Sequence, residues 1–180
     1  MLNLELMTKM LLSKNYIESQ VYIALEEDLG NLGDITSQAT VPQNQKSSAQ
    51  IKLKQDAVLC GMDFACLTFK LLDKKIKISA RKKDGSILKK GSTILKLHGN
   101  TQAILAAERT ALNFLGLMSG IATKAQNYSK IAKKNGSEIY STRKTIVGIR
   151  ELQKYALNIG GANINRMTLD DFFFIKDNHI

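Results

Sequence analysis

A predicted strand–helix–strand unit in the last part of the chain constrains the fold most. Residues 138–142 are rich in β-branched and aromatic side chains, which predicts a short strand. Over residues 147–159 the apolar side chains recur at spacings of three and four, which predicts one face of a helix, ended by Gly160 and Gly161. The continuous apolar run at 172–175 predicts a second strand, buried on both faces. Two strands joined by a helix run parallel, so the pattern predicts an α/β unit.

Basic side chains follow both predicted strands. Arg143 and Lys144 come directly after the first strand, Lys176 comes directly after the second, and Arg166 lies in the loop between them. Because the carboxyl ends of parallel strands meet at one edge of a sheet, we expect these four cations to converge. Converging cations repel one another unless an anion lies among them. The pattern therefore favours a site for a ligand with several negative charges over four independently solvated side chains.

The net charge of +10 allows three classes of partner, namely nucleic acid, an acidic membrane surface and strongly anionic small molecules. Much of the excess charge lies in residues 74–90, around a predicted turn at Asp84 and Gly85. No aromatic residue is interleaved with this cluster, as a platform for single-stranded nucleic acid requires. We therefore interpret the cluster as a solvated hairpin and expect neither a nucleic acid nor a membrane partner.

Targeting and redox signals are absent from the sequence pattern. Residues 1–14 lack the charge, apolar block and cleavage site of a secretory signal, and no apolar run reaches the length of about 20 residues that spans a membrane. We therefore expect a cytoplasmic protein. Cys60 and Cys66 form no CxxC pair and lie near no histidine cluster, so we expect reduced, buried thiols and no metal site.

Residues 1–100 predict a small α+β domain. A helix is predicted over 15–29, and we interpret the acidic triplet at 26–28 as a solvated helix end rather than a metal site. Asp34 or Thr36 can cap the next short element. A half-buried strand, in which apolar and polar residues alternate, is predicted to begin at residue 48, with 57–60 as its expected partner. A helix is expected over 64–71. Further strands are expected at 76–78 and 92–97, with a second turn at Gly91. We interpret His98 as structural.

A long helix capped by Asn100 or Thr101 is predicted to follow, with a domain boundary near residue 100. Gly116, Ser119 and Gly120 are expected to interrupt it. Within it, Glu108 and Arg109 are adjacent charges in an otherwise apolar stretch, where a buried or half-buried charge must be paired or used.

Four separate stretches carry a family resemblance, each weak alone and specific together. They read EDLG with GDIT at 27–36, ERTALN through SGIAT at 108–123, TRKT at 142–145 and IKDNH at 175–179. In motif, order and spacing, the chain resembles quinolinate phosphoribosyltransferase, also called nicotinate-nucleotide pyrophosphorylase (carboxylating).

The resemblance implies an α/β fold, with an α+β sandwich over residues 1–100 and a long helix with the first strands of an incomplete α/β barrel over 101–180. It implies a glycosyltransferase (pentosyltransferase) that converts quinolinate and phosphoribosyl pyrophosphate into nicotinate mononucleotide, pyrophosphate and CO₂ in de novo NAD biosynthesis. It also implies a homodimer, and Mg²⁺ bound together with phosphoribosyl pyrophosphate. Both substrates are polyanions, which agrees with the predicted cationic edge.

Residue roles follow from the same resemblance. Arg143 and Arg166 would bind the quinolinate carboxylates, to which a planar guanidinium is well matched. Lys144 and Lys176 would neutralise carboxylate and phosphate oxygens, and Thr142 would donate a hydrogen bond. The resemblance assigns Arg109 to the partner subunit's site and gives Lys144 and Arg109 catalytic roles. No metal ligand is assigned.

The sequence also departs from the family pattern. Ser141 replaces an aspartate, Val147 replaces a proline, and Asn165 stands where a histidine contacts quinolinate; Asn165 can donate a hydrogen bond but cannot carry charge. The family continues past residues 175–179 with acidic and phosphate-binding segments, so we expect an apparently truncated chain whose apolar edge at 172–175 aggregates or pairs. The alternative function is a catalytically inactive remnant that retains only dimerisation or anion binding.

Overall fold

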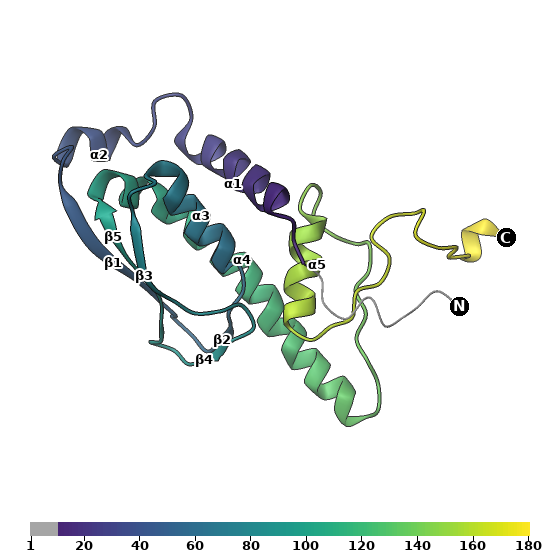
Figure 1. Ribbon diagram of the computed structural model, residues 1–180. Coiled ribbons are helices and arrows are strands. Elements are labelled where there is room, and N and C mark those ends of the chain that lie inside the picture. Colours follow the sequence, from purple (N-terminus) through teal and green to yellow (C-terminus); the bar gives the residue numbers. More distant parts are fainter. Residues whose placement is uncertain (1–10) are drawn as a thin grey trace.

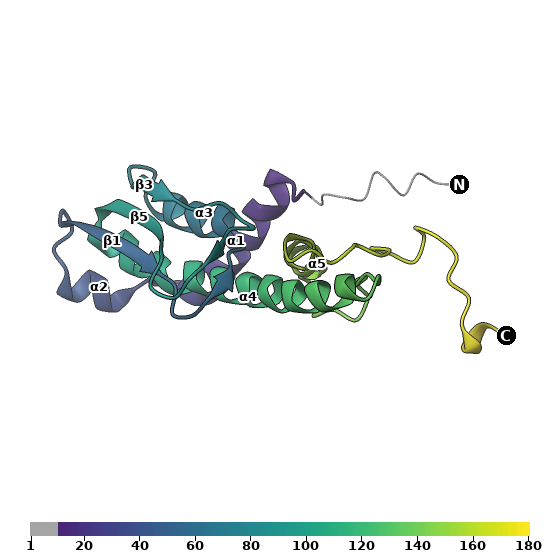
Figure 2. The ribbon, with the colours of Figure 1, turned by 90° about the horizontal axis from the view of Figure 1, so that it is seen from below.

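The computed structural model describes residues 11–180, and most of the stretch in which a secretory signal was sought lies outside them. The elements, in chain order, are α1 Lys14–Leu29, α2 Ile35–Thr40, β1 Lys46–Lys52, β2 Ala57–Val58, α3 Met62–Leu72, β3 Lys77–Arg81, β4 Ile87–Leu88, β5 Thr93–Asn100, α4 Thr101–Lys134, α5 Arg150–Ile159 and the 3-10 turn η2 Asp177–His179. Figures 1 and 2 show α4 running from beneath the sheet to α5, beyond which the C-terminal segment projects. No helix within residues 11–180 has the length and apolarity that crossing a membrane requires.

The predicted antiparallel sheet is confirmed, in the order β1-β5-β3. The apolar side chains of β1 face those of β5, with Ala49 opposite Leu97 and Ile51 opposite Leu95. The predicted partner of β1 at 57–60 was wrong, because β2 pairs with β4 instead. Residues 57–60 are all buried and do not alternate, which suits a strand enclosed between α4 and β4 rather than one face of the main sheet.

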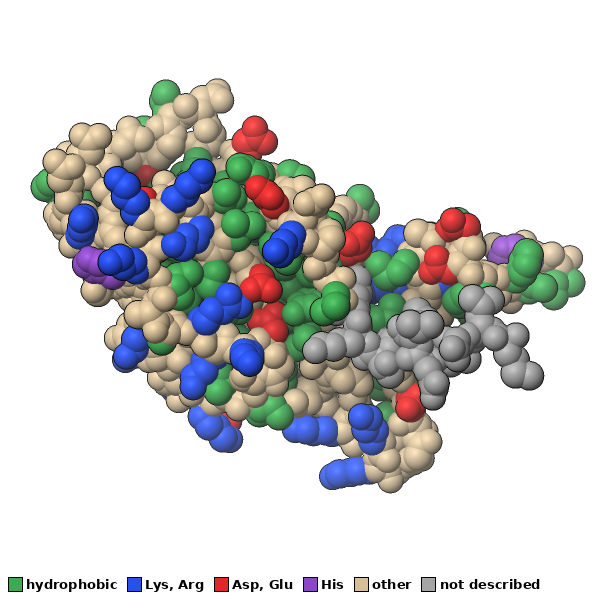
Figure 3. All heavy atoms as spheres, in the orientation of Figure 1, with side chains coloured by type: hydrophobic (Ala, Val, Ile, Leu, Met, Phe, Trp, Pro, Cys, Tyr) green, Lys and Arg blue, Asp and Glu red, His purple; other side chains and the backbone are tan. Residues whose placement is uncertain are grey.

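The basic cluster at 74–90 is solvent-exposed, as predicted, and Figure 3 shows Lys and Arg side chains gathered over the sheet end of the molecule. It is not a hairpin, however. Strand β3 pairs with β5 and strand β4 pairs with β2, so the turn at Asp84 and Gly85 connects two different sheets. Gly85 has a φ of +85°, a backbone conformation that favours glycine.

Two apolar clusters hold the helices against the sheets. The first lies between the sheet, α3 and α4, and includes Phe69, Leu95 and Ala107. The second joins α1, α3, α4 and α5 through side chains that include Val21, Phe64, Met118 and Leu152. Each fully buried side chain of this size contributes about 1.5–3 kcal/mol relative to its exposed state. Helix α5 is thereby fixed to the N-terminal elements.

Asp84 adds a polar link between the same two parts of the chain. Its carboxylate accepts hydrogen bonds from the backbone N–H groups of Gly61 at 2.9 Å and Met62 at 3.0 Å, at the start of α3. It also accepts one from the Tyr155 hydroxyl of α5 at 3.0 Å.

Cys60 and Cys66 are free and buried, as predicted, and burial raises the pKa of both thiols.

Helix α4 is continuous from Thr101 to Lys134, so the predicted interruption at Gly116, Ser119 and Gly120 was wrong. Ser119 does not break the helix because its hydroxyl donates to the Cys60 carbonyl at 3.1 Å and accepts from the Cys60 N–H at 3.0 Å. The two glycines cost about 1 kcal/mol each in a helix interior, which the burial of neighbouring side chains outweighs. The predicted cap is confirmed, since the Asn100 side chain accepts from the Ala103 N–H at 2.9 Å.

The predicted strand–helix–strand unit is confirmed only in part. Residues 138–142 do not form the predicted strand; they make a single isolated parallel bridge, between Tyr140 and Asn163 rather than with residues 172–175. Residues 172–175 form no strand and are exposed, Phe173 by 99%, because none of the described residues lies beside them as a neighbouring strand. Helix α5 begins at Arg150, after Gly148 with φ +84°, and ends at Gly160 and Gly161 as predicted.

Candidate functional site

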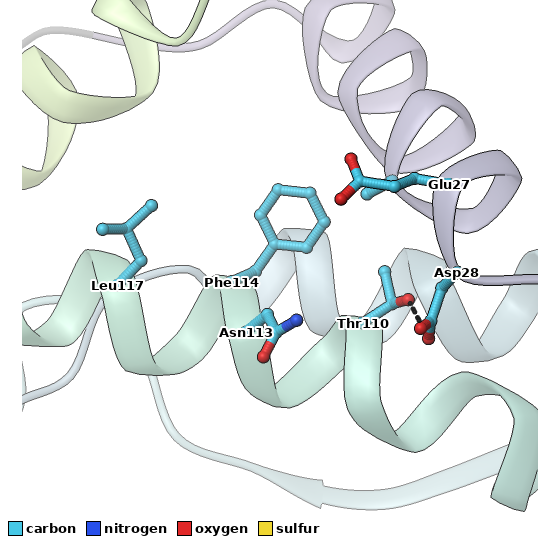
Figure 4. A pocket seen from close by; sticks show the side chains of 7 residues that line it. Glu27, Asp28, Thr110, Asn113, Phe114 and Leu117 are labelled. Atoms are coloured by element: carbon cyan, nitrogen blue, oxygen red, sulfur yellow. Dashed lines mark hydrogen bonds between the residues drawn. The ribbon is translucent and has the colours of Figure 1, made fainter. Parts of the chain in front are cut away.

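The four motif stretches meet in two separate hollows. The first has a volume of about 240 Å³ and lies between the end of α1 and the middle of α4; it is lined by Ala24, Glu27, Asp28, Thr110, Asn113, Phe114 and Leu117. Figure 4 shows Glu27 and Asp28 on α1 facing Thr110, Asn113 and Phe114 on α4. The Thr110 hydroxyl donates a hydrogen bond to the Asp28 carboxylate at 3.1 Å. The stretches at 27–36 and 108–123 are therefore in direct contact.

The lining of the first hollow includes two carboxylates, those of Glu27 and Asp28. The acidic residues at 26–28 are exposed, as predicted for a solvated helix end. Among residues 11–180, no group of three or more His, Cys, Asp or Glu side chains is arranged to hold a metal ion. The carboxylates of Glu27 and Asp28 instead make this hollow acidic, in contrast to the second.

Glu108 and Arg109 lie beside the first hollow and are both exposed, so the expectation of a buried or half-buried charge was wrong. The inward positions of this part of α4 are taken by Ile104, Ala107 and Thr110, which leaves 108 and 109 on the outer surface. Neither ion pair found within residues 11–180 includes Arg109. Its guanidinium is therefore available to a partner outside this chain.

The second hollow has a volume of about 610 Å³ and gathers three of the four predicted cations. It is lined by Arg143, Arg166, Leu169, Asp170, Phe172, Phe173, Phe174, Ile175, Lys176, Asn178 and His179. The Arg166 guanidinium lies 5.7 Å from the centre of the Phe172 ring and 5.0 Å from that of Phe174. The Lys176 ammonium lies 5.4 Å from the Phe174 ring. Aromatic faces attract these cations without neutralising them, which leaves their charge for a ligand.

Arg143 has a buried polar atom without a hydrogen-bond partner. Its Nε is one of two buried side-chain polar atoms, within the part of the chain that the structure describes, that have no hydrogen-bond partner; the other is Ser129 Oγ. A buried donor without an acceptor is costly, and native structures rarely keep one. Arg143 also lines the hollow, which adds its charge to those of Arg166 and Lys176 there.

The remaining predicted site residues do not line the hollow. Thr142 and Lys144 are exposed, and the Thr142 hydroxyl accepts from the Lys144 backbone N–H at 3.1 Å. Asn165 is half-buried, and its backbone N–H donates to the hydroxyl of Ser141 at 3.0 Å. Ser141 therefore anchors the loop that carries Arg166.

Sequence reasoning missed two side chains that support this hollow, Arg150 and Lys154 of α5. Lys154 is fully buried, and its ammonium donates to the backbone carbonyls of Asn165 and Arg166. Burial lowers the pKa of Lys154, the nearby Arg150 and Arg143 lower it further, and Asp171 opposes them. Periodicity gave no signal, because Lys154 lies two residues from both Leu152 and Ala156 and so falls off the apolar face.

Two family models match the chain, and together they cover most of it. The model described as "Quinolinate phosphoribosyl transferase, N-terminal domain" matches residues 34–119. The model described as "Quinolinate phosphoribosyl transferase, C-terminal domain" matches residues 121–180. The parts of the chain that line the two hollows thus fall largely within matched residues.

Individual relatives agree with the family models. The chain is 40% identical to the mitochondrial quinolinate phosphoribosyltransferase [decarboxylating] 2a of Nicotiana tabacum, over 91% of this chain and 46% of that protein. It is 40% identical to a probable nicotinate-nucleotide pyrophosphorylase [carboxylating] of Bacillus subtilis, over 86% of this chain and 53% of that protein. The chain thus spans about half the length of these curated relatives.

Solved structures show the same fold. The structure of the nicotinate-nucleotide pyrophosphorylase from Francisella tularensis superposes with a TM-score of 0.89 at 36% identity, over 94% of this chain and 60% of that one. The corresponding protein from Ehrlichia chaffeensis gives a TM-score of 0.87 at 35% identity, over 94% and 61%.

Proposed function

The chain belongs to the quinolinate phosphoribosyltransferase family, and from that premise we propose that it acts in forming nicotinate mononucleotide, pyrophosphate and CO₂ from quinolinate and phosphoribosyl pyrophosphate. This is the glycosyl-transfer step of de novo NAD biosynthesis. The observation that carries the proposal is the hollow lined by Arg143, Arg166 and Lys176. Quinolinate is a dicarboxylate, so it offers acceptors to two guanidinium groups at once.

The proposed reaction needs a site that binds anions, and it needs no nucleophile from the protein. Bringing two polyanionic substrates together requires cations to offset their repulsion, and displacement at the ribose carbon passes through a cationic centre as pyrophosphate leaves. In this proposal Arg143 and Arg166 bind the quinolinate carboxylates, and Lys176 faces the remaining negative charge. The residues that lie outside the hollow, Thr142, Lys144 and Asn165, have the roles that the family resemblance gives them.

A homodimer completes the proposal. Arg109, exposed and outside the ion pairs found in residues 11–180, would enter the site of a second subunit and act there with Lys144. Mg²⁺ would arrive bound to phosphoribosyl pyrophosphate, because the described residues do not form a metal-binding group of their own and so do not fit a resident ion. We place the protein in the cytoplasm in this proposal.

A second candidate is a catalytically inactive protein that binds the dicarboxylate and dimerises. It needs only the cationic hollow lined by Arg143, Arg166 and Lys176, which this chain contains. The two candidates share the anion site and differ only in turnover.

One pair of assays tests both candidates. Calorimetric titration of quinolinate into the purified chain is expected to show binding that Arg166→Ala weakens, while an exposed control, Lys133→Met, leaves it unchanged. Pyrophosphate release is then followed with quinolinate, phosphoribosyl pyrophosphate and Mg²⁺. Binding with release supports the enzyme, binding without release supports the inactive protein, and no binding contradicts both.

A further inference from the structure

Lys154 is a buried ammonium without a carboxylate partner. It has 0% exposure, and neither of the ion pairs found among residues 11–180 includes it. Burying an unpaired ammonium is costly, and an apolar side chain of similar volume fills space without that cost. The hydrogen bonds that Lys154 makes are therefore the feature to be explained.

Those hydrogen bonds all go to the backbone of one loop. The Lys154 ammonium donates to the Asn165 carbonyl at 3.3 Å and also to the carbonyl of Arg166. One helical turn earlier, Arg150 donates to the Met167 carbonyl at 2.8 Å and to the Thr145 hydroxyl at 3.1 Å. Two cations of α5 thus hold three consecutive carbonyls, those of residues 165–167.

The same loop is held from its other side by acceptors. Ser141 Oγ accepts from the Asn165 N–H at 3.0 Å, and the Asp171 carboxylate accepts from the Met167 N–H at 2.6 Å. Asp171 also accepts from the Thr168 hydroxyl at 2.7 Å. Little of this loop's backbone hydrogen bonding is left to solvent, so the direction in which Arg166 leaves the backbone is fixed.

We propose that Lys154 is a positioning residue, which holds the Asn165–Arg166 backbone so that the Arg166 guanidinium faces the ligand. Lys154 does not line the hollow, so it acts through Arg166 and not by touching the ligand. The inference rests on the proposed function for the nature of the ligand, a dicarboxylate. A displacement of about 1 Å in a group that binds a substrate can cost about a hundredfold, which is the scale on which such a support acts.

A double-mutant cycle separates positioning from general support of the fold. Quinolinate affinity is measured by calorimetry for wild type, Lys154→Met, Arg166→Ala and the double variant, with Lys133→Met as the exposed lysine control. We expect Lys154→Met to weaken binding about tenfold or more, and the double variant to bind as weakly as Arg166→Ala alone. Additive losses would overturn the proposal, because Lys154 would then act independently of Arg166. So would unchanged affinity in folded Lys154→Met.

Amide hydrogen exchange tests the support without any ligand. In Lys154→Met we expect exchange of residues 163–168 to quicken about tenfold or more while α3 keeps its protection, and no change in Lys133→Met. If Lys154→Met does not fold, Arg150→Met is used in its place. Arg150 is half-buried, and the substitution removes its hydrogen bond to the Met167 carbonyl. Its effect on quinolinate affinity is then combined with that of Arg166→Ala in the same double-mutant cycle. A wild-type chain that binds no quinolinate would contradict the proposed function, whereas unchanged exchange at 163–168 would overturn the positioning role itself.

Discussion

The region from β1 to α4 and the segment after α4 are held together in different ways. In the first, side chains such as Phe69, Leu95 and Ala107 are closed off from water between a sheet and two helices. After α4, helix α5 packs into the core through Leu152 and Ala156, but the loop at 165–167 is held by side chains that bond to its backbone, those of Lys154, Arg150 and Asp171. The comparison teaches that apolar packing holds the helices, whereas hydrogen bonds from side chains to backbone hold the loop that carries Arg166.

The largest difference in the free energy of unfolding is expected between alanine substitutions of two phenylalanines. Phe64 is 1% exposed and stacks on Phe114 with ring centres 4.8 Å apart, whereas Phe173 is 99% exposed. Phe64→Ala should lower the free energy of unfolding by about 3–5 kcal/mol, because it leaves a cavity in the core. Phe173→Ala should leave the urea midpoint unchanged. Equal shifts of the midpoint in the two variants would refute the division.

A smaller loss of stability is expected at Asp84, which joins the two regions. Asp84→Ala removes the acceptor for two N–H groups at the start of α3 and for the Tyr155 hydroxyl, so it should cost about 2 kcal/mol in urea unfolding. Asp56, an exposed carboxylate paired with Lys89 at 2.8 Å, provides the control, and Asp56→Ala should change the midpoint little. Similar midpoints for the two variants would show that Asp84 is not a structural link.

Arg166→Ala should lower the affinity for quinolinate and leave the stability of the fold unchanged, the opposite of what is expected for Phe64→Ala and Asp84→Ala. A hydrogen bond to a charged group is worth about 1.5–3 kcal/mol, so quinolinate affinity should fall about tenfold to a hundredfold. The urea midpoint should stay near that of wild type, since Arg166 packs against Phe172 and Phe174, which are themselves exposed. A large loss of stability with unchanged affinity would reverse our assignment of the second hollow.

The smallest expected effect is the pH dependence of the hydrogen bonds that the Asp171 carboxylate accepts from Met167 and Thr168. Hydrogen bonds from Thr168 and Met167 lower the pKa of this carboxyl below its ordinary value. Its contribution is therefore present above the unfolded pKa of about 3.9 and is lost as the pH falls through the lower folded pKa. Thr168→Val removes the first of these bonds, so an NMR titration of the Asp171 carboxyl carbon should move its midpoint upward. An unmoved midpoint would show that the Thr168 hydroxyl does not stabilise the charged form.

How much could be predicted from the sequence differs between the two regions for a physical reason. Period-two alternation at Ala49 and Ile51 and helical spacing in α3 predicted their elements correctly, since burial on one face leaves a repeating signal. The glycines of α4 were misleading, because packing outweighs local propensity. The predicted pairing partner of β1 was also wrong, because residues 57–60 are all buried and carry no alternation that would indicate which strand they pair with.

In the segment after α4, helical spacing predicted α5 and its end at Gly160, but the strand signals failed. The apolar run at 172–175 predicted a buried strand, yet a strand needs a neighbour that the described residues do not provide. Three cations that line the second hollow, Arg143, Arg166 and Lys176, were predicted from their places around two expected strands, although the first is reduced to a single bridge at Tyr140 and the second does not form. Lys154 left no periodic signal, because its partners are backbone carbonyls, which every residue has.

The central claim is that Arg143 and Arg166 form one dicarboxylate site, and the guanidinium Nε–H signals test it directly. In a chain labelled with ¹⁵N-arginine, titration with quinolinate should shift the signals of both residues along one binding curve, because both line the second hollow. Arg81, paired with Asp63 at 2.7 Å on the N-terminal domain, should not shift. Equal shifts in Arg81, or none in Arg143 and Arg166, would contradict the account.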